Sequence, residues 1–216
     1  MRIAALILLA AGIAVLADQL LHRAMLERIT EQADKDPGLA AAYMLQITRT
    51  RDCLASSGSE SEVAARALFT VEGIATSRTE HALEWAAAWL SGALGFRAPD
   101  LSYGPGQIRP SALLKLAATE NLPSPQRQAL QQAALQPLTL FDECRAHALA
   151  GIMIRNMPAE PTSDDALIPR VQLIRIAKDW NGQENSEDAE AVIAGLRYQR
   201  LVYEVFQRLR FETLRQ

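Results

Sequence analysis

The chain has 216 residues, of which 49% are hydrophobic and 6% aromatic, and its formal charge at pH 7 is −3. This length allows one substantial core and is short for two domains of typical size. Ala and Leu are abundant and alternating Val/Ile/Thr stretches are scarce, which predicts an all-α fold. The near balance of 22 basic and 25 acidic residues creates no field that attracts a polyanion, so nucleic acid is not expected as a partner.

The N-terminus combines a basic residue with an apolar run. Arg2 precedes an almost unbroken apolar stretch over residues 3–17, and polarity returns at Asp18. An apolar run of about 15 residues is shorter than the roughly 20 that a spanning helix needs. Small residues before a cleavage point after Ala17 favour a signal peptide.

Two other interpretations of this segment remain. Apolar residues continue at helical spacing as far as Ile29, which would suit a membrane anchor, and a buried helix of a cytosolic protein has the same composition. We therefore assign residues 1–29 to a signal peptide or membrane anchor. Residues 30–216 are predicted to form a single helical domain, which either export interpretation sends across the inner membrane.

The rest of the chain alternates between helical patterns and turns. Apolar residues at helical spacing predict helices over residues 39–54, 62–75, 79–94, 111–119, 124–135, 139–157, 167–180 and 186–214. Trp85 and Trp89 lie one helical turn apart and are interpreted as core residues. Residues 95–110 are rich in Gly and Pro, which predicts the longest ordered loop of the chain.

The cysteines and histidines indicate no metal site. Cys53 and Cys144 could pair in an exported chain, closing a loop of about 90 residues worth on the order of 4 kcal/mol. The sequence has no Cys-x-x-Cys spacing, and its three histidines are isolated from one another. We expect neither a metal nor a cofactor.

Glu72 is the first candidate for chemistry. It belongs to the predicted helix 62–75, and Val71 and Ile74 are its apolar neighbours. Low polarity around a carboxyl group favours the protonated form and raises the pKa, as a general acid working near neutral pH requires. Most helical glutamates are exposed to solvent, which is the simpler alternative.

The Gly-rich loop supplies the second candidate set. Ser102, Gly104 and Gln107 fit the pattern Ser-x-Gly-x-x-Gln, and Asn181 follows further along the chain. Glycine permits a positive φ and close approach to a ligand, while Ser, Gln and Asn offer neutral hydrogen-bonding groups suited to sugars. A simple turn for the loop and a helix C-cap for Asn181 are the structural alternatives.

The order of these residues resembles the lytic transglycosylases and goose-type lysozymes. In that family a helix with the catalytic glutamate precedes a Ser-x-Gly-x-x-Gln loop, an Ala-rich helix and an Asn-containing segment. The matching residues, over roughly residues 40–210, are Glu72 for the glutamate, Ser102, Gly104 and Gln107 for the loop, Ala148, Gly151 and Ile152 for the Ala-rich helix, and Asn181 with Tyr198 or Tyr203 near the end. Gly73 and Trp180 depart from the family's Ser and Tyr.

The resemblance implies a lysozyme-like fold and a periplasmic peptidoglycan lytic transglycosylase. Glu72 would protonate the bond between N-acetylmuramic acid and N-acetylglucosamine and then act as base, without a cofactor. Ser102, Gly104, Gln107, Asn181 and Tyr198 would bind the glycan. Asp100 and Asp179 lie near these segments, but neither stands where the resemblance places a nucleophile. The partners would be peptidoglycan strands and, for a retained N-terminal segment, the inner membrane.

Two alternatives explain the same residues. One is a non-catalytic envelope protein that binds glycan or scaffolds a partner on this fold. The other is a membrane-tethered helical bundle with accidental motifs, which predicts that Glu72, Gln107 and Asn181 lie far apart.

Overall fold

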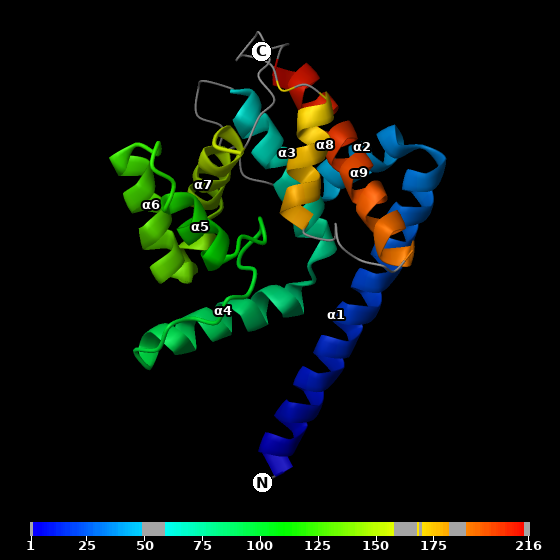
Figure 1. The fold of residues 1–216 in the computed structure, drawn as a ribbon. Helices are drawn as coiled ribbons and strands as arrows, with labels where there is room; N and C mark the ends of the chain where they lie inside the picture. Colours follow the sequence, from blue (N-terminus) through cyan, green and yellow to red (C-terminus); the bar gives the residue numbers. More distant parts are fainter. Residues whose placement is uncertain (1, 49–58, 158–167, 169, 182–188, 214–216) are drawn as a thin grey trace.

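The computed structural model describes residues 2–48, 59–157, 168, 170–181 and 189–213, with the side chains of residues 2–8, 181 and 189 left out of the description. The elements are α1 (Arg2–Lys35), α2 (Pro37–Ile47), α3 (Glu60–Ala75), α4 (Arg78–Ala93), α5 (Pro110–Ala117), α6 (Ser124–Leu135), the 3-10 helix η1 (Pro137–Phe141), α7 (Glu143–Arg155), α8 (Arg170–Asn181) and α9 (Ala189–Thr213) (Figure 1). Within these residues the only extended pairing is an isolated bridge between Tyr103 and Ile108. The predicted all-α class is confirmed for this part of the chain.

Side-chain caps explain where several helices begin. Capping boxes start α3 at Ser59 and α4 at Ser77, and in each a glutamate carboxylate accepts a hydrogen bond from the backbone N–H of the cap serine. The predicted helix over residues 139–157 is wrong as a single element, because Asp142 separates η1 from α7 and accepts a hydrogen bond from the Arg145 amide. The predicted helix over residues 39–54 begins two residues earlier and ends at Ile47, where Thr48 is extended, so its predicted continuation is wrong at that point. Residues 49–54 lie outside the described residues.

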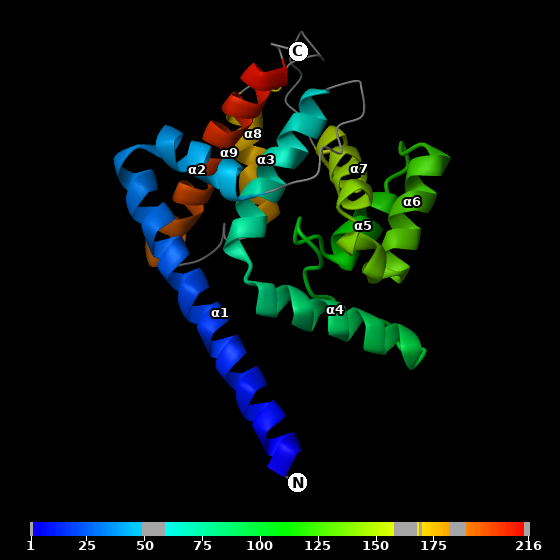
Figure 2. The same cartoon turned by 180° about the vertical axis from the view of Figure 1, so that it is seen from behind.

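Helix α3 occupies the centre of the molecule. It packs against α7 on one side and α9 on the other, while α2 and α8 also pack on α9 and α5 pairs with α6 (Figure 1, Figure 2). The apolar stripe predicted for α3 is buried, with Leu68 and Phe69 at 0% and 1% exposure. The core therefore surrounds the helix that carries Glu72.

Helix α1 is one continuous helix that joins the N-terminal apolar segment to the domain. Its later turns belong to the core, since Ile29 and Ala33 are buried. The boundary predicted between residues 29 and 30 thus falls inside a helix. By length and composition alone, Leu9–Lys35 is apolar enough to cross a membrane, a property that signal sequences share. The chain therefore begins with an apolar helix that suits a signal or an anchor.

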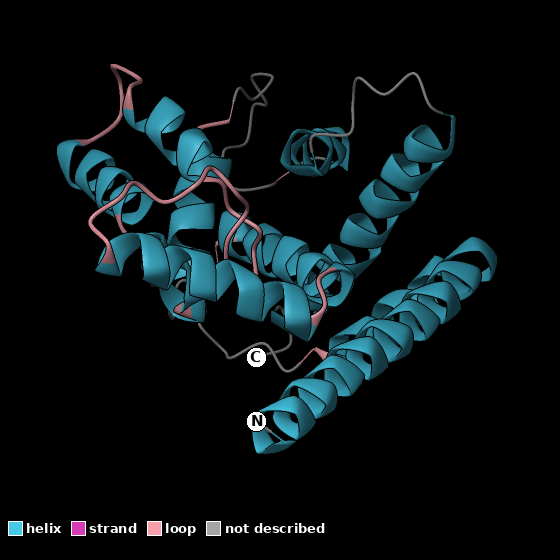
Figure 3. Cartoon of the chain, turned by 90° about the horizontal axis from the view of Figure 1, so that it is seen from below, coloured by secondary structure: helices cyan, strands magenta, loops and turns pink. Residues whose placement is uncertain are grey.

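Helix α4 crosses the lower side of the molecule (Figure 1, Figure 3). Trp85 and Trp89 are 47% and 51% exposed, and their rings stack with centroids 6.3 Å apart. Their assignment to the core is therefore wrong. Ala88 is the only buried residue of α4. The helix turns His81 and Glu84 toward the rest of the protein, and both side chains are partly buried there.

Candidate active site

Glu72 lies in the last turn of α3 and is only 9% exposed. The Tyr198 hydroxyl, from α9, donates a hydrogen bond of 2.6 Å to its Oε1 atom. Burial raises the pKa of Glu72 to about 7, and the hydrogen bond from Tyr198 opposes this rise. The expectation of a buried carboxyl with a raised pKa is confirmed.

Tyr198 and Tyr203 have different surroundings, although both belong to α9. Burial and the adjacent Glu72 carboxyl raise the pKa of Tyr198 well above its ordinary value, so its hydroxyl stays protonated and donates. The ring of Tyr203 instead lies under the guanidinium of Arg170, 4.7 Å from the ring centroid. Of the two candidates, Tyr198 is the one that contacts Glu72.

A cavity of about 410 Å³ opens beside Glu72. Its lining residues come from α3, the 95–109 loop, α5, α7 and α8, with one further methionine just after α7, and they are Glu72, Ser102, Gln107, Ile108, Arg109, Ala112, Met153, Met157, Asp179 and Trp180. Three predicted site residues, Glu72, Ser102 and Gln107, therefore meet at one cavity. For Glu72 and Gln107 this contradicts the expectation that accidental motifs lie far apart.

The loop that carries Ser102 and Gln107 is closed by its own backbone. Tyr103 and Ile108 exchange two hydrogen bonds of 3.0 and 3.1 Å, and Gln107 adopts a positive φ of 50°. Gly104 has a φ of 70°, and a Cβ atom there would lie 2.1 Å from the Leu140 carbonyl oxygen. Gly104 does not line the cavity, so its glycine serves packing of the loop against η1 rather than ligand contact.

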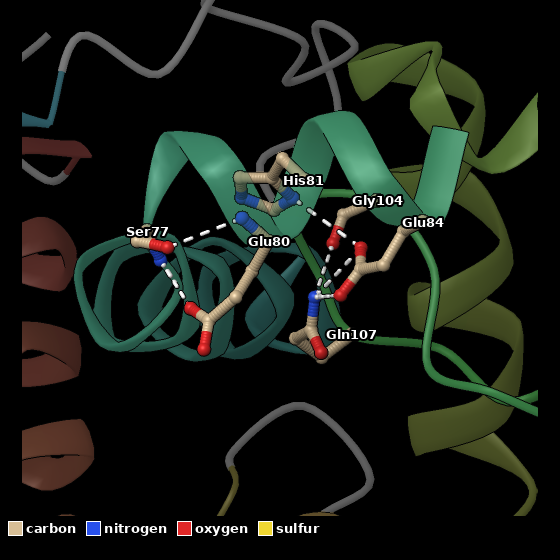
Figure 4. Close-up of polar contacts among 6 residues, drawn as sticks. All are labelled: Ser77, Glu80, His81, Glu84, Gly104 and Gln107. Atoms are coloured by element: carbon tan, nitrogen blue, oxygen red, sulfur yellow. Dashed lines mark hydrogen bonds and ion pairs between the residues drawn. The ribbon is translucent and has the colours of Figure 1, made fainter. Parts of the chain in front are cut away.

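The side-chain amide of Gln107 is held in place by α4. Its Nε2 atom donates to Glu84 Oε1 at 3.0 Å, to Oε2 at 3.2 Å and to the Gly104 carbonyl at 3.2 Å (Figure 4). His81 Nδ1 lies 3.4 Å from Glu84 Oε2, an oxygen that Gln107 also contacts. The amide oxygen of Gln107 faces away from Glu84 (Figure 4), so it is left to accept a hydrogen bond. Sequence analysis missed Glu84.

Helix α8 forms the opposite wall. Trp180 donates its indole N–H to the Gly106 carbonyl at 3.0 Å, which ties α8 to the loop. Its neighbour Asp179 lines the cavity, so a second carboxylate is present where none was expected. The other acid near the loop, Asp100, accepts the backbone N–H of Ser111 at 2.9 Å, and hydrogen bonding from the Ser111 hydroxyl together with this N–H lowers its pKa. The side chain of Asn181 lies outside the description.

Two further residues, His147 and Cys144, do not line the cavity. His147 is buried against the Phe69 ring, with centroids 4.1 Å apart, and burial lowers its pKa to about 4, so it is neutral. Cys144 is disulfide-bonded, and Cys53, the other cysteine of the sequence, lies outside the described residues. The described residues contain no cluster of three or more His, Cys, Asp or Glu side chains suited to a metal ion.

The site combines three groups. Glu72 is a buried carboxyl group that can be protonated, and the Tyr198 hydroxyl donates a hydrogen bond to it. The amide oxygen of Gln107 points away from Glu84, which binds the amide nitrogen (Figure 4). Such a set can donate a proton to a bound molecule and accept one back. No family model matches the sequence, and no curated protein and no solved structure is significantly similar to it.

Proposed function

We propose that this chain is a peptidoglycan lytic transglycosylase with a lysozyme-like fold, which cleaves the bond between N-acetylmuramic acid and N-acetylglucosamine. The observation that supports it is the state of Glu72. A carboxyl group with a pKa of about 7, at the wall of a cavity, is half protonated near neutral pH. It can therefore serve as acid and base in one cycle.

In the first step Glu72 acts as the acid. Its proton passes to the glycosidic oxygen, the bond from the muramic acid C1 atom to that oxygen breaks, and the N-acetylglucosamine unit leaves with a free hydroxyl. The N-acetyl group of the muramic acid stabilises the positive charge that develops at C1. Glu72 is then ionised and accepts the hydrogen bond from Tyr198, at 2.6 Å in the structure.

In the second step Glu72 acts as the base. It removes the proton from the C6 hydroxyl of the same muramic acid, whose oxygen then forms a bond to C1. The product is an anhydro-sugar, the carboxyl group is protonated again, and no water is consumed. Low polarity around Glu72 suits this return, because burial stabilises the neutral form of the acid.

The cavity has the size and polarity for a sugar. Its volume of about 410 Å³ lies in the range of about 300–1,000 Å³ that is usual for ligand sites. The free amide oxygen of Gln107 would accept an N–H or O–H of the substrate. Ser102, whose Oγ accepts a hydrogen bond of 3.4 Å from Arg109, would contribute its hydroxyl. Met153 and Trp180 provide apolar surface for the faces of the ring.

Location follows from the first helix. The exposed apolar part of α1 supports export through, or anchoring in, the inner membrane. The domain would then face the periplasm, where peptidoglycan is its partner. This part of the proposal rests on α1 rather than on the cavity.

A lysozyme-like hydrolase is the second candidate, and Asp179 favours it. Most glycosidases use two carboxyl groups, one as acid and the other as base or nucleophile. Asp179 and Glu72 line the same cavity. In a hydrolase Asp179 would be essential and the product would carry a reducing end, whereas the transglycosylase needs Glu72 alone.

The test is mass spectrometry of the soluble products after the full chain is incubated with peptidoglycan. Wild type and Asp179→Asn should both release anhydro-muropeptides, and Glu72→Gln should release none. Reducing-end products that disappear in Asp179→Asn would identify a hydrolase. No products from a folded wild-type chain would favour the non-catalytic glycan-binding alternative.

A further inference from the structure

The outer surface of α4 is apolar after the first turn, where Arg78 and Glu80 are exposed, and its apolar side chains continue past the end of the helix at Ala93. Large side chains that are exposed by about half or more are Leu83 (65%), Trp85 (47%), Trp89 (51%), Leu90 (51%), Leu94 (58%) and Phe96 (70%). The sequence has no charged residue from Trp85 to Phe96. We call these six side chains the α4 apolar face.

Arg78 and Glu80 are exposed in the first turn, but the later polar side chains of the helix bond to the protein or to the helix itself. Glu84 binds Gln107, and Ser91 donates to the Ala87 carbonyl within the helix at 2.7 Å. A helix on a water-facing surface has the opposite arrangement, with apolar residues toward the core and charged residues outside. The inverted polarity indicates that the α4 apolar face meets a medium other than water.

Helix α4 begins beside the end of the apolar run in α1. The backbone N–H and the hydroxyl of Thr79 both donate to Asp18 Oδ2, at 3.0 and 2.7 Å, and Gln19 donates to the Ser77 hydroxyl at 2.9 Å. Asp18 is the first acidic residue after the apolar stretch. Leu9, Ile13 and Leu16 of that stretch are each about 60% exposed. Both helices occupy the same side of the molecule (Figure 1, Figure 3).

We propose that α4 lies in the interfacial layer of the membrane that α1 enters, with the α4 apolar face directed into the lipid. The contact between α4 and α1 identifies lipid as the occupant. The exposed apolar residues Leu9 to Leu16 of α1 would lie in lipid, and α4 begins beside Asp18, where this apolar stretch ends. Tryptophan is enriched at the boundary between hydrocarbon and water, and helices with one apolar face bind there. The proposal does not depend on the enzymatic activity.

One consequence does rest on the proposed function. Gln107, in the cavity wall, is bonded to the inner side of α4, so roughly one helix diameter, about 10 Å, separates the cavity from the lipid. The glycan cleaved there would be strands that run close to the membrane surface rather than distant layers of the wall.

Tryptophan fluorescence tests the membrane contact directly. The chain has three tryptophans. Two lie on the α4 apolar face. The third, Trp180, lines the cavity and donates a hydrogen bond to the Gly106 carbonyl. The full chain is reconstituted into phosphatidylcholine vesicles whose acyl chains carry bromine at different depths. We expect strong quenching of the wild type, greatest for bromine near the headgroups. The paired variant Trp85→Phe with Trp89→Phe should lose the quenchable signal and leave unquenched Trp180 emission.

The other outcomes overturn the proposal. Quenching by aqueous acrylamide without quenching by bromine would place α4 in water. Protection of Trp85 and Trp89 from both quenchers would mean that a second copy or another protein covers the face. Equal bromine quenching of wild type and the double variant would assign the signal to Trp180. Because both substitutions replace half-exposed rings by phenylalanine, folding should persist, which circular dichroism checks.

Discussion

Helices α3 and α4 follow one another in the chain and have 16 residues each, but they place their large apolar side chains in different surroundings. Helix α3 buries Leu68 and Phe69 together with the carboxyl group of Glu72. Helix α4 turns Glu84 inward and leaves Trp85 and Trp89 outside. The comparison shows that a sequence pattern predicts that a helix has an apolar face. Whether that face is buried or exposed depends on the elements that pack against the helix.

The two glutamates also have different partners. Glu72 has a neutral hydroxyl beside it and is largely buried, which makes it suitable for proton transfer. Glu84 has an amide group and an imidazole, and it holds Gln107 in the wall of the same cavity. One helix thus carries the proposed acid and the next positions the loop that faces it.

The largest expected effect is on catalysis at α3. Glu72→Gln keeps the shape of the side chain and removes the transferable proton, so cleavage of peptidoglycan should fall by roughly 10²–10⁴-fold. The rate of anhydro-muropeptide release, measured by mass spectrometry, checks this. Asp179→Asn serves as the control. Full activity in Glu72→Gln would remove Glu72 from the mechanism.

A matched pair of leucines tests the difference in burial. Leu68→Ala in α3 removes a side chain that is 0% exposed and should cost about 2–5 kcal/mol of unfolding free energy. Leu83→Ala in α4, where the side chain is 65% exposed, should change it by less than about 0.5 kcal/mol. Denaturant unfolding in the same detergent measures both. Similar losses in the two variants would mean that the α4 apolar face is packed against protein.

Stability should depend on pH through Glu72. Its pKa rises from 4.5 to about 7 on folding, so the folded state holds the proton more tightly. The stabilising contribution of the protonated Glu72 is therefore fully present below pH 4.5 and is lost as the pH rises through about 7. The loss in the free energy of unfolding is about 3 kcal/mol. Glu72→Gln should lose that part of the pH dependence and be more stable than wild type above pH 7. Identical pH profiles of the two proteins would contradict the raised pKa.

Two glycines compare the loop with α4. A Cβ atom on Gly106 would lie 2.3 Å from the buried Phe69 ring, so Gly106→Ala should cost about 1–3 kcal/mol. Nothing lies within 4 Å of a Cβ atom on Gly92 in α4, and Gly92→Ala should be neutral or mildly stabilising. Thermal unfolding of the two variants checks this. A harmless Gly106→Ala would show that the loop lies farther from α3.

The smallest effect concerns the positioning of Gln107. Glu84→Ala removes the two carboxylate acceptors of the Gln107 amide N–H group and leaves only the Gly104 carbonyl. It should lower kcat by about 10-fold, since a hydrogen bond to a charged group contributes about 1.5–3 kcal/mol. Glu84→Gln keeps one acceptor and should recover part of the rate. Steady-state kinetics separates kcat from KM. Equal losses in both variants would indicate that charge, rather than positioning, matters.

Local pattern was enough to predict part of this arrangement. The burial of Glu72 follows from apolar neighbours at helical spacing, and the helix over residues 124–135 has the predicted bounds. The Ser-x-Gly-x-x-Gln pattern placed Ser102 and Gln107 beside Glu72. These features depend on hydrophobic periodicity or on a short motif, and both can be read directly from the order of residues.

Other features depend on contacts between distant segments. Glu84 and Gln107 are 23 residues apart, and no spacing rule links a helix to the loop that follows it. Asp179 reaches the cavity because Trp180 ties α8 to the loop. The exposure of Trp85 and Trp89 escaped prediction because apolar side chains at helical spacing are typical of a buried helix, and spacing does not say which partner covers them.

The most direct test of the central claim is the titration of Glu72 itself. Carbon-13 NMR of the folded chain follows each glutamate carboxyl with pH, and the resonance absent from Glu72→Gln identifies the group. We predict a midpoint at about 7, with the carboxyl protonated below it. A midpoint near the ordinary value of 4.5 would mean that Glu72 is ionised at neutral pH and cannot supply the proton.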